Sequence, residues 1–344
     1  MRILAALLLL AARSDRETCN IPVFRYALER WRTSPYEIVV FHRGPLEGAA
    51  RATVDEFRKQ SANVDVDHVD LATPLKGRIK TAWEAQKDPA EPWMVALFPG
   101  TDFVAWAGPA SAEAARLLVD SPARRELARR ILSGDTAVWL LLESGEKGKD
   151  EAALALLEPE LRKLEKSLKL PAHAADDPPI MSDIPVKLAF STLRVSRADA
   201  AEKAFVEMLV RSDTDLKGPV VFPIFGRGRA LWAITGAGLT ADTIGEAAAF
   251  LAGPCACEAK ELNPGLDLLV AQEWEQALAF AREDTLKPIP IPEIPKAAAP
   301  EPPKAGGIPS PPPPSPPDRT WLLLSIAGAV VLVLVTGTRA FRRA

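Results

Sequence analysis

The sequence has little cysteine, histidine or tyrosine: its 344 residues include 3 cysteines, 3 histidines and 2 tyrosines. Tetrahedral metal sites take four ligands, mostly from cysteine and histidine, so this small supply disfavours a structural metal centre. The chain also lacks a G-x-S-x-G, H-E-x-x-H or glycine-rich P-loop motif, and nothing in it assembles a nucleophile, a base and an oxyanion site. With 42 basic and 45 acidic residues and no basic stripe, nucleic acid is not an expected partner.

Proline, by contrast, is abundant and unevenly distributed: 14 of the 32 prolines lie in residues 288–317. Proline fixes φ and has no backbone N–H, so this stretch predicts an extended polyproline II segment rather than a packed domain. We therefore expect a proline-rich linker over residues 287–319. A docking segment for a proline-binding domain is the alternative.

Apolar runs at both ends of the chain predict its cellular placement. Residues 1–14 hold one early arginine, about ten apolar residues and small residues, the pattern of a signal peptide, with a buried helix as the alternative. Residues 320–338 suit one transmembrane helix, and arginines in the tail 339–344 favour the cytoplasmic side. The intervening body, expected to be extracytoplasmic, has room for two domains, over 15–134 and 135–286.

The body contains an internal repeat. A proline, an apolar strand, a glycine turn and a second strand with tryptophan span residues 92–108, and the same pattern recurs at 219–233. Continuous apolar strands at 37–41 and 137–142 precede these hairpins, and each is followed by an amphipathic helix. The predicted order of elements is β-α-β-α-β-β-α, twice over. Helices after the two hairpins are expected over 112–119 and 241–252.

This order resembles the thioredoxin fold, an α/β fold in which a proline, usually cis, precedes the third strand. Pro92 and Pro219 occupy that place in the two copies. In thioredoxin-like oxidoreductases the corner after the first strand carries C-G-P-C, with a reactive thiolate at the start of a helix. Here the corner reads Arg43-Gly44-Pro45-Leu46. Gly44 and Pro45 keep the central Gly-Pro, but arginine and leucine replace the two cysteines, so no thiol exchange is expected at this corner.

The corresponding corner of the second copy, Glu143–Glu146, has no thiol either. The resemblance therefore implies two tandem domains that keep the fold without its usual chemistry. It also implies that a surface of turns and hairpin edges around Arg43, Pro92 and Pro219 could still bind an extended peptide, against the alternative that the corner is kept only for packing. This candidate face consists of Arg43, Gly44, Pro45, Pro92 and Pro219.

The three cysteines form the other candidate site. Cys255 and Cys257 make a C-x-C pair, and Cys19 lies near the expected start of the mature chain. Exported proteins meet oxidising conditions, so a structural disulfide within this set is the default expectation. A redox pair and a two-thiolate metal site are the alternatives.

The N-terminal segment 19–31 carries an apolar stripe and is expected to be a helix with Asn20 as its N-cap, covering an edge of the first domain. The run 235–241 contains G-x-G-x-x-A between a strand and a helix. Its strand is the return arm of a hairpin, whereas a dinucleotide fingerprint needs the first strand of a parallel βαβ unit. We therefore interpret Gly236 and Gly238 as turn residues.

Two histidines and three aspartates occur close together in the first copy. An alternating pattern places Asp65 and Asp67 on a solvated face, which favours a surface role over a metal or acid–base cluster with His42, His68 and Asp70.

Taken together, these patterns predict a membrane-anchored extracytoplasmic protein that binds a protein or peptide in the cell envelope, without a cofactor or catalytic residue. Thiol–disulfide or metal chemistry at Cys255 and Cys257 is the rival hypothesis. A purely structural module of an envelope complex is a third.

Overall fold

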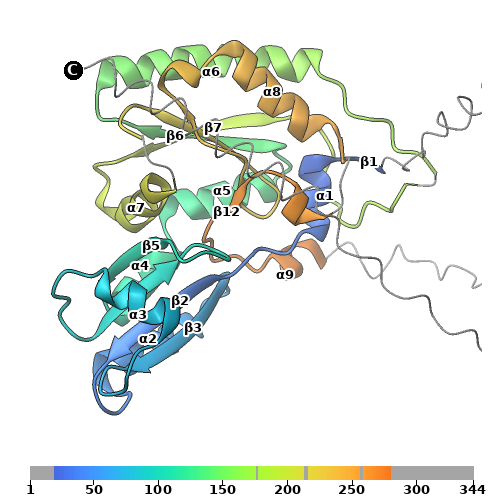
Figure 1. Ribbon diagram of the computed structural model, residues 1–344. Helices are drawn as coiled ribbons and strands as arrows, with labels where there is room; N and C mark the ends of the chain where they lie inside the picture. The colour runs from blue at the N-terminus through green and yellow to red at the C-terminus, as the bar shows by residue number, and fades with distance from the viewer. Residues whose placement is uncertain (1–18, 176, 213–215, 256–258, 280–344) are drawn as a thin grey trace, which may run out of the picture. The chain divides into compact units, whose positions relative to one another are not determined.

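The first sheet has four strands in the order β3-β2-β4-β5 (Figure 1). The central strand β2 runs parallel to β3 and antiparallel to β4, and β4 pairs with β5 as a hairpin. The computed structural model describes residues 19–175, 177–212, 216–255 and 259–279. The bounds of these strands are β2 Tyr36–His42, β3 Val64–Asp70, β4 Trp93–Leu97 and β5 Val104–Pro109.

Helices cover both faces of this sheet. Because side chains alternate along a strand, Ile38 and Val40 of β2 point into one core while Val39 and Phe41 point into the other. The first core packs against α2 and α4, and the second against α3. These helices are α2 Gly48–Phe57, α3 Gly77–Glu84 and α4 Ala112–Val119.

The second sheet repeats the arrangement. Its path is β12-β9-β8-β6-β7, and β10 pairs with β8 outside this path. The central strand β6 lies parallel to β7 and antiparallel to β8, as β2 does with β3 and β4. The strands are β6 Ala137–Glu143, β7 Phe190–Ser196, β8 Val220–Phe225, β9 Arg229–Ala230, β10 Ile234–Thr235 and β12 Leu266–Asp267.

Helices α6 and α8 cover one face of the second sheet, and α5 and α7 cover the other (Figure 1). Helix α7 also contacts β5 of the first sheet, so it lies at the junction of the two repeats. The core of the first repeat accordingly includes Met208 from α7. These elements are α5 Pro122–Leu132, α6 Lys147–Ser167, α7 Lys203–Arg211 and α8 Ala241–Ala252, with short 3-10 turns at Ala200–Glu202, Gly236–Gly238 and Lys260–Leu262.

The N-terminal segment differs from its prediction. Cys19–Pro22 forms strand β1, which pairs with β11 (Pro254–Cys255), and helix α1 begins only at Val23 and ends at Arg30. Asn20 is therefore not a helix cap, because a strand partner more than 200 residues away sets its conformation. Helix α1 contacts α8 and β8, so it covers the second repeat and not an edge of the first.

The C-terminal part of the described chain joins the two repeats. Successive residues of one extended segment alternate between cores: Leu268 and Val270 lie in a core of the second repeat, and Leu269 lies in that of the first. Ala271 then makes an antiparallel bridge with Ala62. Helix α9 (Trp274–Ala279) follows and packs Trp274 and Leu278 into the second repeat. All described residues belong to one compact unit.

Several predicted features lie outside the described residues. These are the signal peptide 1–14, the linker 287–319, the transmembrane helix 320–338, the tail 339–344 and Cys257. Within the described part of the chain, no helix is both long enough and apolar enough to span a bilayer.

Candidate functional site

The first corner begins where β2 ends, at His42. His42 is buried, and its Nε2 lies 3.1 Å from Nδ1 of His68 on the neighbouring strand β3. The register of the parallel pair places His42 beside Asp70, two residues after His68. The structure thus brings His42, His68 and Asp70 together, while Asp65 and Asp67 are exposed nearer the start of β3.

Asp70 fixes the backbone of this corner. Its Oδ1 accepts hydrogen bonds from the backbone N–H groups of Gly44 and Ala72, each at 2.9 Å. The bonds from Ala72 and Gly44 hold the pKa of Asp70 below its ordinary value because they stabilise the carboxylate. Gly44 has a φ of +75°, a left-handed conformation that suits glycine at this turn.

Arg43 links the corner to the segment before β4. Its Nε and Nη2 donate to the two carboxylate oxygens of Glu91 at 3.1 and 2.8 Å, a two-point contact that is mostly exposed. The next peptide bond, Glu91–Pro92, is cis. Arg43, Gly44, Pro45 and Pro92 therefore lie around one corner.

Pro219 does not reproduce the surroundings of Pro92. Glu91–Pro92 is the one cis peptide bond in the described residues, so Pro219 follows a trans bond. Arg197 occupies this region of the second repeat: its guanidinium donates to the carbonyls of Glu143, Leu216 and Gly218 at 2.9, 2.5 and 3.0 Å.

The second corner is further closed by a carboxylate of its own helix. Asp150 accepts from the backbone N–H groups of Ser144 and Gly145 at 2.7 and 3.0 Å, and from the Ser144 hydroxyl at 2.8 Å. The N–H groups of Ser144 and Gly145 are therefore satisfied internally, as that of Gly44 is by Asp70 at the first corner. The two repeats share a topology, but their corners present different surfaces, and the first is the better candidate site.

Two of the three cysteines, Cys19 and Cys255, lie on the β1–β11 pair, which is separate from both corners. The Cα atoms of Cys19 and Cys255 are direct partners across the β1–β11 pair. Cys255 is 2% exposed, which disfavours the accessible thiolate that redox work requires. Among the described residues, no group of three or more His, Cys, Asp or Glu side chains is placed so that it could hold a metal ion, and this includes His42, His68 and Asp70.

The glycine run 235–241 has the structure of a turn. Gly236–Gly238 forms a 3-10 turn after the short strand β10, and the side chain of Thr240 caps α8 by accepting from the Thr243 N–H. Because β10 is antiparallel to β8, the parallel βαβ context of a dinucleotide fold is missing here.

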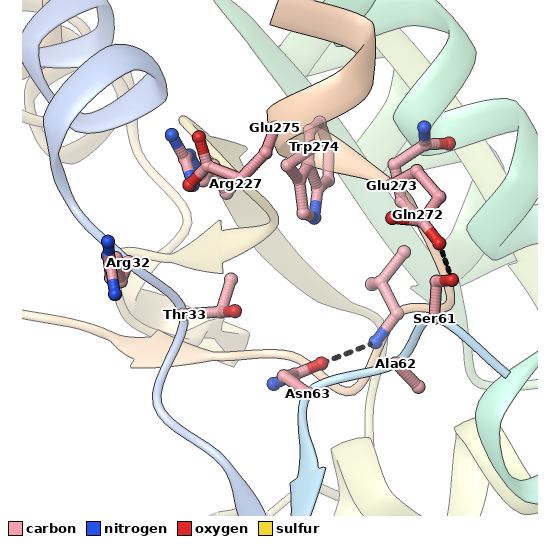
Figure 2. A pocket seen from close by; sticks show the side chains of 11 residues that line it. Arg32, Thr33, Ser61, Ala62, Asn63, Arg227, Gln272, Glu273, Trp274 and Glu275 are labelled. Atoms are coloured by element: carbon pink, nitrogen blue, oxygen red, sulfur yellow. Dashed lines mark hydrogen bonds and ion pairs between the residues drawn. The ribbon is translucent and has the colours of Figure 1, made fainter. Parts of the chain in front are cut away.

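A cavity of about 440 Å³ lies where the two repeats meet (Figure 2). Several polar side chains of its lining bind one another: Arg227 pairs with Glu275 at 2.6 Å, and the Ser61 hydroxyl donates to Glu273. Asn63 accepts from the N–H of Val270 at 3.1 Å. These contacts close the joint between the repeats, so we assign the cavity a structural role.

Sequence reasoning missed the polar centre of this joint, Asp267. Its carboxylate accepts from the Ser34 N–H, Lys260 Nζ and Arg229 Nη1, at 2.7, 2.8 and 2.9 Å. No motif connects these residues, which lie up to 233 positions apart. Comparison with known proteins adds no assignment, since neither a family model nor a curated protein matches the chain.

Proposed function

We propose that the body of the chain consists of two tandem thioredoxin-like domains that lack the redox cysteines. The strand order of both repeats supports this: in each, a central strand is parallel to the second strand and antiparallel to the third, which pairs with a fourth. The cis bond before Pro92, opposite a corner with Gly44 and Pro45, supports it further.

The function that fits this arrangement best is non-catalytic binding of a protein or peptide at the first corner. The difference between the corners carries the proposal. Arg197 fastens the second corner to the segment before β8, whereas at the first corner an exposed Arg43 and an exposed Pro45 lie beside Pro92. An exposed charged pair next to an ordered turn can recognise a polar peptide with little reorganisation of the site.

The proposal includes a place in the cell. A signal peptide over 1–14, a proline-rich linker over 287–319, a transmembrane helix over 320–338 and a cytoplasmic tail make this a single-pass protein with its body outside. The partner is then a protein or peptide of the cell envelope.

The rival function, thiol–disulfide or metal handling at Cys255 and Cys257, has less support. Cys255 is buried in the core beside α1 and α8, and attack on a disulfide needs an accessible thiolate. We therefore keep the binding function as the conclusion.

Site-specific photocrosslinking tests this function. A photoreactive amino acid replaces Arg43 in full-length protein expressed in cells, and the matched control carries it at Glu146, an exposed position of the second corner. We expect a discrete crosslinked partner from position 43 and none from position 146. Equal crosslinking at both positions, or insulin reduction that depends on Cys255, would contradict the proposal.

A further inference from the structure

Strand β3 forms an open edge of the first sheet. It is the last strand in the order β3-β2-β4-β5, and among the described residues it pairs with β2 alone (Figure 1). Two hydrogen bonds fix the direction of its backbone groups: Tyr36 N–H donates to Asn63 O at 2.9 Å, and Leu71 N–H donates to His42 O at 2.7 Å. The backbone N–H and C=O groups of odd-numbered residues in β3 therefore point toward β2. Those of even-numbered residues point outward, away from the sheet.

Val66 and His68, in the middle of β3, have outward backbone groups that are available to another strand. The ends of the strand differ. Val64 N–H donates to Ala62 O, and Asp70 O accepts from Thr73 N–H, so local turns engage both ends of β3. Between them, no hydrogen bond within the described residues engages the outward N–H and C=O groups of Val66 or His68. An extended peptide can pair with such an edge, as in β-augmentation.

The side chains of β3 define the charge of this edge. Asp65 and Asp67 lie two residues apart on one face of the strand, and both are exposed. Neither makes an ion pair with any described residue. A strand advances about 3.3 Å per residue, so the two carboxylates repeat at about 6.6 Å, the spacing of alternate side chains on an added strand.

This charge pattern selects the occupant. Antiparallel pairing of two copies of β3 about Val66 would place Asp65 of each copy opposite Asp67 of the other, and like charges directly opposite destabilise a pair. The chain's own residues 288–317 are also a poor partner for this edge, because they are rich in proline, which has no backbone N–H for strand pairing. We infer that the β3 edge docks an extended, proline-free segment of another protein that carries lysine or arginine at alternate positions.

The inference goes beyond the proposed function, because it concerns a different surface and a different mode of recognition from the Arg43 corner. The probe is a synthetic ten-residue peptide of alternating lysine and valine, titrated onto the full-length chain purified in mild detergent. Two matched probes accompany it: an alternating glutamate–valine peptide, and the lysine–valine peptide with methylated backbone nitrogens, which keeps the charge and loses the N–H donors.

Binding of the lysine–valine peptide alone is the expected result. The double variant Asp65→Asn, Asp67→Asn should weaken it at least tenfold, and the control variant Asp102→Asn, Glu113→Gln, which removes two exposed acids elsewhere, should leave it unchanged. Val66→Pro should also abolish binding, because it removes an outward N–H and keeps the bonds to β2.

Three results would overturn the inference: no binding of the lysine–valine peptide, equal binding of its methylated form, or equal loss in the control variant. The last two would indicate attraction between charges without strand pairing. Because the titration does not involve residue 43, its outcome is separate from that of the crosslinking experiment.

Discussion

Asp267 is a single residue whose charge helps to hold the joint between the repeats. It is 4% exposed and lies between two cations, Arg229 and Lys260, while its own carbonyl accepts the Tyr36 hydroxyl at 3.0 Å. Burial by itself raises the pKa of Asp267, but the hydrogen bonds from Lys260 and from the Ser34 backbone outweigh it, so the pKa is lowered overall. The folded protein therefore stabilises the ionised carboxylate.

We expect Asp267→Asn to lower the free energy of unfolding at pH 7 by about 3 kcal/mol, because it leaves two buried cations without their counter-charge. The folded-state pKa of Asp267 lies below the unfolded value, so its contribution is fully present above about pH 4 and is lost as the pH falls through the folded pKa. Urea unfolding at pH 7 and at lower pH measures both effects.

The variant should therefore differ most from the parent at neutral pH, and the difference should shrink in acid. Asp102→Asn, at an exposed position, is the matched control and should change the stability little. A gap between Asp267→Asn and the parent that stays constant down to low pH would contradict the assigned role.

At the scale of elements, periodicity predicted much of the fold. Helices expected over 112–119 and 241–252 are α4 and α8 with the same bounds, and the strand expected over 37–41 is β2 with one more residue at each end. These elements have local signals: apolar spacing, and a Ser or Thr side chain that caps each helix. The strand at Cys19–Pro22 has no such signal, since its partner is distant in sequence.

The β1–β11 pair leads to a prediction for the cysteines. Directly opposed residues of an antiparallel pair have Cα atoms about 4.5–5.5 Å apart, within the range that a disulfide spans. Because Cys19 and Cys255 are opposed in register, we expect a disulfide between them and a free thiol at Cys257. Peptide mapping of the unreduced protein from an oxidising compartment identifies the link. A bond from Cys257 to either of the other two cysteines would contradict it.

In the candidate site, too, features set by neighbouring residues in the sequence were predictable, and contacts between distant residues were not. The Gly-Pro corner and Pro92 are visible in the sequence because turns and prolines are local signals. The Arg43–Glu91 contact and the His42–His68 pair depend on which strands become neighbours, and alternation of side chains alone does not fix that. Arg197 was missed for the same reason, since it closes the second corner across two loops.

For the whole molecule, the sequence repeat suggests two separable domains, but the packing joins them. Helix α7 contacts the first sheet, and Arg124 of α5 is buried close to Tyr36 of β2 and Glu202. Burial lowers the pKa of Arg124 to about 10, although the nearby Glu202 carboxylate opposes the shift. Such a joint forms only when both repeats are folded. The spacing of apolar residues within one repeat therefore does not predict the contacts between the repeats.

The extended segment after β12 makes this coupling testable. Leu269 is 1% exposed in the core of the first repeat, while its neighbours Leu268 and Val270 are buried in the second. Truncation of a buried leucine costs about 2–5 kcal/mol through lost apolar contact and the cavity left behind, so we expect Leu269→Ala to destabilise the protein by that amount. Leu262→Ala, at a position 76% exposed, is the control and should change the stability by less than about 0.5 kcal/mol.

Because one segment fills both cores, the loss should affect the two repeats together. Tryptophan fluorescence and far-ultraviolet circular dichroism should then report a single unfolding transition that moves to lower urea concentration in Leu269→Ala. If the two repeats were independent domains, the variant would unfold in two steps, with only the first repeat destabilised. That outcome would show that Leu269 fills a local core without linking the repeats, and the shared joint around Asp267 would then need another explanation.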